Sequence, residues 1–163
     1  MLAPFPHVCR QTTTSTSKSS SDLLTMATAQ QLKGDIPKAI DLAQQALLIQ
    51  QKQDNSRNKH AEFYDTTLFI GKLFQLQGNL EQAEVQFRES LRYASQVGER
   101  GRRDKYVAIS HLATVQRLQQ KYAEAERNYL TALSGLEIEV GWKDGFTNHT
   151  SMELVRLYRE TSE

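Results

Sequence analysis

Histidines are the residues of this sequence best suited to acid–base or metal chemistry, and they are scattered. The four of them, His7, His60, His111 and His149, lie in different segments. None has a second histidine or a cysteine three or four residues further on, the spacing that places two strong metal ligands on one helix face. The sequence therefore predicts no metal site, and we expect His111 to be a packing or hydrogen-bonding histidine rather than a catalyst.

The other reactive groups do not favour an enzyme either. Cys9 is the only cysteine, which excludes an intramolecular disulfide and points to a reducing compartment. The sequence contains no glycine-rich phosphate loop and no dinucleotide-binding fingerprint. We expect a non-enzymatic protein that uses no catalytic residue and no cofactor.

The charge balance excludes some classes of partner. Twenty Lys and Arg residues stand against 19 Asp and Glu, a net charge of +1, so no global field attracts nucleic acid. The densest basic cluster, residues 100–105, lacks interleaved aromatic residues, and we interpret it as a solvated loop. No apolar run approaches the roughly 18 residues that cross a bilayer. We expect neither a nucleic-acid partner nor a membrane span.

Residues 1–20 differ from the rest of the chain. Nine of the ten residues from Thr12 to Ser21 are Ser or Thr, and no acidic residue precedes Asp22. Such a composition cannot bury enough apolar surface to fold alone, so it predicts a disordered tail. The alternative is a transit peptide, because these are Ser-rich and poor in acid. We expect a cytoplasmic protein, or a mitochondrial or plastid one if this segment is a transit peptide.

Residues 21–163 carry an internal repeat. A tight turn followed by the start of a helix occurs at residues 34–40, 78–84 and 120–126. Each copy holds an alanine at the same position, Ala39, Ala83 and Ala125, with another small residue seven positions later. Two helical turns return a residue to the same face. Each pair of small residues therefore marks a seam where two helices pack closely.

The periodicity predicts an all-α fold built of antiparallel helix pairs. We expect helices at residues 21–33, 37–52, 59–77, 80–98, 102–119, 122–140 and 147–161. Short polar turns separate the two members of each pair. Longer connections at residues 54–56, 98–101 and 141–145 separate the pairs.

The same positions of each unit hold residues of similar size. In the first helix a large residue is followed by a small one, and in the second helix a bulky residue lies between two small ones. These residues are Ile70, Gly71, Phe74, Gly78, Ala83, Phe87 and Ser90 in one unit, and Leu112, Ala113, Tyr122, Ala125, Tyr129 and Ala132 in the next. This pattern resembles the tetratricopeptide repeat family. The repeat spacing of 44 and then 42 residues, from Gly34 to Gly78 to Gln120, is longer than the usual period of roughly 34. With the connection at residues 141–149, it looks most like the kinesin light chain type of repeat.

The resemblance covers about residues 21–161 and implies a right-handed superhelical α-solenoid of about three units. A fourth unit is represented by a single helix at residues 147–161. Its polar side comprises Glu153, Arg156, Arg159, Glu160 and Glu163, and opposes Leu154, Val155 and Tyr158. We expect this amphipathic helix to cap the stack.

The resemblance also implies that the first helices of the pairs line a concave groove that receives a peptide or a partner helix. In the register of the family, the groove positions are Leu24, Thr28 and Gln31; Leu68, Lys72 and Gln75; Ser110, Thr114 and Arg117; and Met152, Arg156 and Arg159. Each set has i, i+4, i+7 spacing and so shares one helix face. The carboxylate clamp of co-chaperones does not carry over, because Leu24 and Thr28 stand where its first Lys and Asn belong.

The residue types at these positions indicate the kind of ligand. Leu24, Leu68 and Met152 offer apolar contacts, while the basic residues favour an acidic peptide: Lys72, Arg117, Arg156 and Arg159. The alternative is that these residues only form solvated helix faces. Two functions stay open: an interaction module that acts as adaptor or scaffold, and a structural or assembly subunit, possible as a homo-oligomer, that self-associates through the ends of its repeats.

Overall fold

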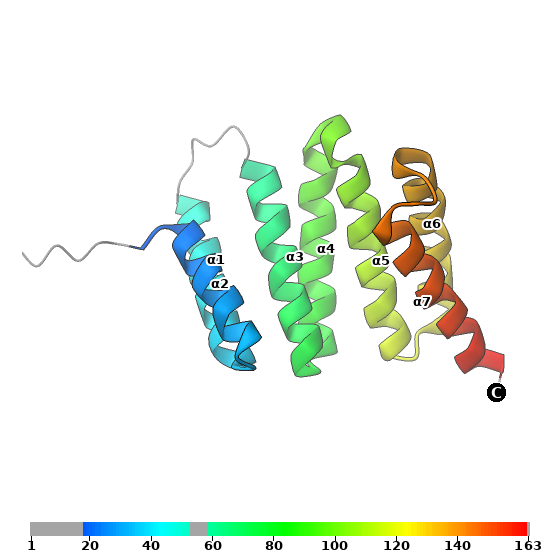
Figure 1. The fold of residues 1–163 in the computed structure, drawn as a ribbon, viewed down its shortest axis with the longest axis horizontal. Coiled ribbons are helices and arrows are strands. Elements are labelled where there is room, and N and C mark those ends of the chain that lie inside the picture. The colour runs from blue at the N-terminus through cyan, green and yellow to red at the C-terminus, as the bar shows by residue number, and fades with distance from the viewer. Residues whose placement is uncertain (1–17, 53–58, 163) are drawn as a thin grey trace, which may run out of the picture.

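Consecutive antiparallel helices form the part of the chain that this computed structural model describes, residues 18–52 and 59–162 (Figure 1). The helices are α1 (Ser20–Leu32), α2 (Ile36–Lys52), α3 (Lys59–Gln77), α4 (Leu80–Gln96), α5 (Arg102–Leu118), α6 (Tyr122–Val140) and α7 (Gly145–Ser162), with a 3₁₀ turn η1 (Gly98–Gly101) between α4 and α5. Every predicted boundary lies within two residues of these. Most of the predicted tail and the connection at residues 54–56 lie outside the described residues.

Local hydrogen bonds explain where the helices begin. Ser19 and Asp22 form a capping box at the start of α1, each side chain bonding the backbone N–H of the other. The side chain of Asn79 accepts from the backbone N–H of Gln82 at the start of α4. Gly34 and Gly78 end the preceding helices with positive φ angles of 82° and 83°, a conformation that glycine adopts without strain.

The predicted seams of small residues are present at the helix contacts. Ala39, Ala83 and Ala125 are fully buried. Gly71 on α3 lies directly under Phe87 on α4, where an added Cβ would be 2.7 Å from the nearest ring carbon. Only a glycine allows this approach of the two helices. The fold is therefore the all-α repeat solenoid that the sequence predicts.

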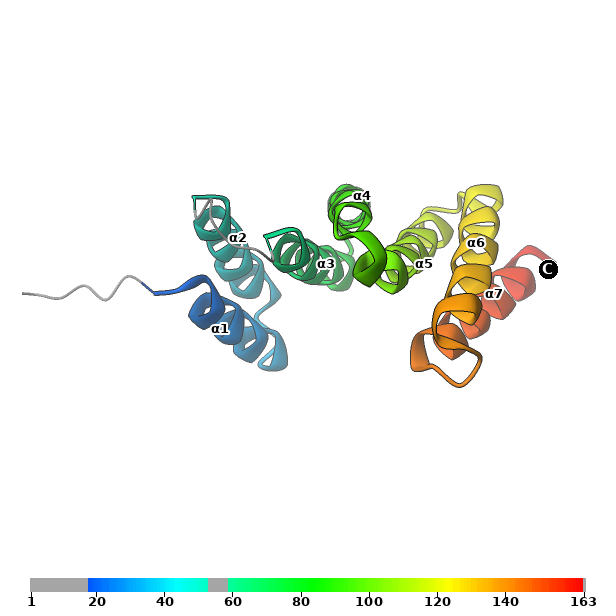
Figure 2. The same ribbon diagram turned by 90° about the horizontal axis from the view of Figure 1, so that it is seen from above.

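Each helix packs mainly on the helices that precede and follow it in the chain. Seen from above, α2 and α4 lie on one side of the stack and α1 and α3 on the other, while α6 runs across the stack beside α7 (Figure 2). A contact between α5 and α7 departs from this rule, because it skips α6. This arrangement brings α3, α5 and α7 to one common surface.

The orientation of α7 differs from the predicted one. Glu153, predicted on its polar side, is buried, whereas Val155 and Tyr158, predicted on its apolar side, are exposed. The buried face instead comprises Thr147, Thr150, Glu153, Leu154 and Leu157. The physical reason is that Glu153 is ion-paired with an arginine of α5, which compensates for the loss of its water. Among the described residues, no helix is long and apolar enough to cross a membrane.

Candidate functional site

A cavity of about 380 Å³ opens on the surface shared by α3, α5 and α7. It is lined by Gln75, His111, Thr114, Arg117, Leu118, His149, Glu153 and Arg156. Four of these, Gln75, Thr114, Arg117 and Arg156, are among the predicted groove residues. The structure thus gathers part of the predicted set from three helices around one hollow.

The other predicted residues lie outside this cavity. Leu24 lines a separate cavity near the start of α1, and Met152 and Arg159 line a third one on α7. Leu68 and Ser110 are buried, so they offer no surface to a ligand. Thr28 is exposed, and its hydroxyl donates to the backbone carbonyl of Leu24 one turn earlier.

Arg117 is a structural residue rather than a free cation. Only 7% of it is exposed, and its guanidinium forms ion pairs with Glu153 at 3.2 Å and Glu160 at 2.5 Å on α7. Glu153 also pairs with Arg156 at 2.8 Å. The expectation that Arg117 lends positive charge to the groove is therefore wrong, because two carboxylates neutralise it.

Thr114 and Ser110 also serve the contacts between helices. The hydroxyl of Thr114 accepts a hydrogen bond from the hydroxyl of Tyr129 on α6 at 3.0 Å. The hydroxyls of Ser110 and Thr150 bond at 2.8 Å, which ties α5 to α7. Both side chains are therefore already hydrogen-bonded within the protein.

His111 is a residue of the cavity with a polar atom that lacks a partner. Its ring stacks on Phe87, with centroids 5.2 Å apart, and its Nε2 atom is buried with no hydrogen-bond partner. Burial, with smaller electrostatic contributions from Lys72 and His149, lowers the pKa of His111 to about 3. The imidazole is therefore neutral at physiological pH, and its unpaired nitrogen is a hydrogen-bonding group that the described structure leaves unused.

Charges of both signs surround the cavity. Burial lowers the pKa of Lys72, and the carboxylate of Asp65 opposes this shift. Burial also raises the pKa of Asp65, with Asp104 adding to the rise. Arg156 pairs with Glu153, and its side chain is exposed to solvent. Lys72 and Arg156 are thus the two predicted cations that stay near the cavity, at half-buried and exposed positions.

Four residues of the cavity are absent from the predicted groove set: His111, Leu118, His149 and Glu153. Leu118 was detectable, because Leu32, Leu76 and Leu118 occupy one repeat position, 44 and 42 residues apart, and all three are exposed. His149 and Glu153 share a face of α7 at i, i+4 spacing. Among the described residues, no group of three or more His, Cys, Asp or Glu side chains could hold a metal ion.

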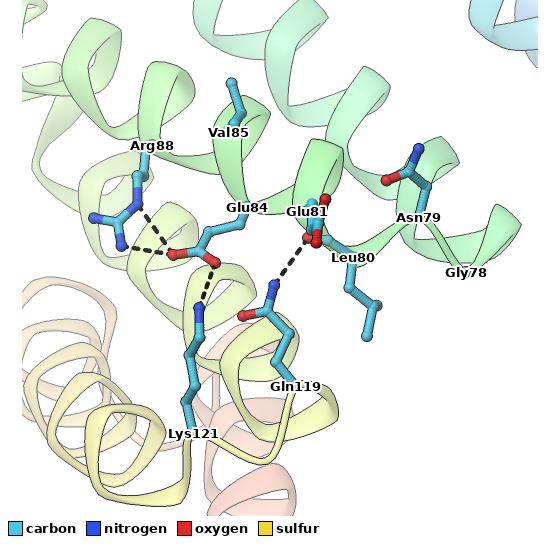
Figure 3. A pocket seen from close by; sticks show the side chains of 9 residues that line it. All are labelled: Gly78, Asn79, Leu80, Glu81, Glu84, Val85, Arg88, Gln119 and Lys121. Carbon is cyan, nitrogen blue, oxygen red and sulfur yellow. Dashed lines mark hydrogen bonds and ion pairs between the residues drawn. The ribbon is translucent and has the colours of Figure 1, made fainter.

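A larger hollow of about 670 Å³ lies away from this surface, between the start of α4 and the turn from α5 to α6 (Figure 3). Its polar side chains mostly bind one another. Glu84 accepts from Arg88 at 2.6 Å and from Lys121 at 3.1 Å, and Gln119 donates to the carbonyl of Leu80. These contacts join the second repeat to the third, so the hollow is explained by the assembly of the stack.

Comparison with known proteins decides the family. Family models of the tetratricopeptide repeat match residues 22–54 and 63–138, which together are most of the described chain. The chain belongs to the tetratricopeptide repeat family. Tetratricopeptide repeat folds are generally protein–protein interaction modules and are typically non-catalytic. No curated protein sequence matches the chain significantly.

Several solved structures share the fold of this tetratricopeptide repeat protein. BtubC (BKLC) from P. vanneervenii aligns with a TM-score of 0.74 and 18% identity, over 86% of this chain and 55% of that chain. Two structures of a Podosopora anserina protein, described as a kinesin light chain with nearly identical TPR-like repeats, follow. One gives a TM-score of 0.67 at 15% identity, over 88% of this chain and 67% of that one. A variant of the same protein gives 0.70 at 14%, over 90% and 71%.

These identities show a common fold and nothing about a common ligand. The chain spans about half of the length of the BtubC structure. Its kinesin light chain-like repeats, with their long helices, are the feature shared with these neighbours. What the groove binds has to be argued from its own side chains.

Proposed function

We propose that this protein is a non-catalytic adaptor or scaffold that binds a segment of another protein in the groove between α3, α5 and α7. The observation that carries the proposal is the cavity that α3, α5 and α7 line together, with His111, whose buried Nε2 has no hydrogen-bond partner, among its lining residues. Buried polar groups are nearly always hydrogen-bonded, so a ligand that supplies a partner gains affinity there. Family membership supports a protein as that ligand.

The surroundings of His111 favour an acidic segment that also carries apolar side chains. Lys72 and Arg156 flank the cavity with positive charge, while Leu76 and Leu118 expose apolar surface at the ends of α3 and α5. A carboxylate between the two cations and a large apolar side chain on the leucines would satisfy both features. Arg117 does not contribute to binding the acidic segment, because Glu153 and Glu160 of α7 neutralise its charge.

Charge reversal tests this proposal. The wild-type chain and a Lys72→Glu, Arg156→Glu variant are titrated with two sets of fluorescent short peptides, one rich in Asp and Glu and one neutral, with equal leucine content. We expect the wild type to prefer the acidic set, and the variant to lose affinity for it by about tenfold or more. The preference should also weaken as salt rises, because exposed charges are screened over about 8 to 10 Å.

A matched control carries Lys38→Glu and Arg127→Glu, which change two exposed cations on the second helices α2 and α6. This control should bind the acidic set as the wild type does. Circular dichroism confirms that each variant keeps its helices. Equal binding by both double variants, or no preference of the wild type for acidic peptides, would reject the groove as the site.

A second candidate function is self-association through the ends of the repeats. The exposed apolar residues of α7 favour it, because Met152, Val155 and Tyr158 lie on the last helix of the stack (Figure 1). Light scattering over a concentration series distinguishes the two functions. A strict monomer leaves the groove as the main site.

A further inference from the structure

Helix α7 lies at the end of the stack, beside α6 (Figure 2). We call the exposed surface that carries Met152, Val155 and Tyr158 the outward face of α7. Met152 is 70% exposed, Val155 48% and Tyr158 43%. A hollow of about 330 Å³ runs along this face, lined by Ser151, Met152, Val155, Arg156 and Arg159. Apolar side chains this exposed and this close together are typical of a surface that another element covers.

The repeat register shows what covers the same face one unit earlier. A shift of 42 residues maps Val155 onto Ala113 and Tyr158 onto Gln116 of α5. Both are buried there, Ala113 in a cluster with residues of α6, and Gln116 in hydrogen bonds with Glu124 and Asn128. In α5, then, a neighbouring helix covers these positions. In α7, Val155 has no such cover among the described helices, whereas the hydroxyl of Tyr158 donates to Glu126 of α6 at 2.8 Å and the residue stays 43% exposed.

The arginines of the two helices supply a second, electrostatic comparison. The same shift maps Arg159 onto Arg117, whose guanidinium pairs with Glu153 and Glu160 of the next first helix. Those two glutamates are seven residues apart on one face of α7, with the buried Leu157 between them. Arg159 is exposed and forms no ion pair among the described residues. The charge that would complement it is absent from the described part of the stack.

We propose that the outward face of α7 docks an acidic amphipathic helix of a partner protein. The helix places two carboxylates, seven residues apart, against Arg159, and an apolar side chain between them over Met152 and Val155. The interaction is the one that α5 already makes with α7, repeated one unit further along. It goes beyond the binding of a peptide in the groove, because it uses the end of the stack.

The apolar residues of this surface would suit a second copy of the chain as well, but its charges fit a second copy less well than an acidic helix of a partner. Within α1 to α6, no helix carries two acidic residues seven positions apart, and the pair on α7 is already engaged with Arg117. Two copies joined through α7 would also bring Arg156 and Arg159 of one copy toward those of the other. Like charges brought together across an interface oppose binding.

The test uses a fluorescent, helix-stabilised peptide with the sequence of α7, because this is the helix type that the α5 surface binds. Fluorescence anisotropy measures its affinity for the full chain. We expect binding to the wild type and a loss of about tenfold or more for Arg159→Glu and for Val155→Glu. A peptide carrying Glu153→Lys and Glu160→Lys should restore binding to Arg159→Glu and bind the wild type poorly.

Matched controls change residues of similar exposure elsewhere. Arg127→Glu on α6 and Val85→Glu on α4, where Val85 is 50% exposed, should bind the peptide as the wild type does. Lys72→Glu should also leave binding unchanged, so that failure of this site and failure of the groove are distinguishable. Absence of wild-type binding, equal binding by Arg159→Glu, or no rescue by the reversed peptide would overturn the proposal. A dimer in light scattering that Val155→Glu abolishes would assign the surface to a second copy instead.

Discussion

The imidazole of His111 on α5 lies against the ring of Phe87 on α4, with the two planes 14° from parallel. Phe87 also covers Gly71 on α3, so one aromatic ring joins three helices of two repeats. Burial penalises the charged form of His111, so its imidazole stays neutral.

The first prediction concerns acid. In the unfolded chain His111 titrates near its usual pKa of 6.5, and in the folded protein near 3. Between these values the unfolded state binds a proton that the folded state does not, so stability falls as the pH is lowered from 6.5 toward 3. The contribution is at most about 1.4 kcal/mol per pH unit. The free energy of unfolding in urea, measured at several pH values, should show this loss.

The matched variant is His111→Gln, which keeps a hydrogen-bonding side chain and cannot titrate. Its stability should decline less steeply than that of the wild type over the same pH range. Other groups, including Asp65 and Asp104, titrate in both proteins and cancel in the difference. If the stability of the wild type and of His111→Gln falls equally steeply with pH, His111 does not cause the loss of stability in acid.

The second prediction concerns the ion pairs of Arg117. Arg117→Met leaves the buried carboxylate of Glu153 with only the exposed Arg156 as partner. An uncompensated buried charge destabilises a protein strongly, so we expect a loss of about 3 kcal/mol in the free energy of unfolding. Urea denaturation followed by circular dichroism measures it.

Removing the second charge supplies the control for that loss. The double variant Arg117→Met, Glu153→Leu replaces the buried pair by apolar side chains, and it should recover stability to within about 1 kcal/mol of the wild type. If the double variant is as unstable as Arg117→Met alone, the loss comes from packing and the electrostatic explanation is wrong.

The third prediction concerns the turn between α5 and α6. Gln120 has a positive φ of 62°, at the repeat position that Gly34 and Gly78 occupy in the other two turns. A side chain in this conformation costs about 1 kcal/mol or more, and the greater freedom of an unfolded glycine offsets part of the gain. Gln120→Gly should therefore stabilise the fold by about 0.5 kcal/mol, measured as a higher urea midpoint at unchanged slope.

The reciprocal change tests the same reasoning. Gly78 has a φ of 83°, and an added Cβ there would meet no atom within 4 Å. Gly78→Ala should thus destabilise the protein through backbone conformation alone. Opposite signs for the two substitutions are expected. A destabilising Gln120→Gly would show that the side chain of Gln120 makes a contact that outweighs its backbone strain.

Sequence alone predicted the fold well because its signals are local and repeated. The alanines at 39, 83 and 125 mark the seams, and Gly34 and Gly78 mark the turns, each by a property of the single residue. The errors concern α7, where the pattern of one helix cannot reveal which face its neighbours cover. Val155 and Tyr158 were predicted on the packed face because they are apolar, yet both are exposed, and Tyr158 contacts α6 through the hydrogen bond of its hydroxyl to Glu126.

The candidate site was predicted only in part, for a related reason. Position in the repeat correctly placed Gln75, Thr114 and Arg156 around one cavity. Repeat position could not show that Arg117 forms ion pairs with Glu153 and Glu160, because these partners are 36 and 43 residues away in the chain. Ion pairs between distant elements depend on the three-dimensional packing, which helical periodicity does not encode.

The succession of neighbour contacts along the stack determines how the protein opens. A chain of units that touch only their neighbours behaves as a one-dimensional lattice, in which disorder enters at the ends and spreads inward. Because the α5–α7 contact skips a helix, the last three helices are coupled as one block. Amide hydrogen exchange should therefore show α1 and α2 opening on their own at low cost, while α5, α6 and α7 open together.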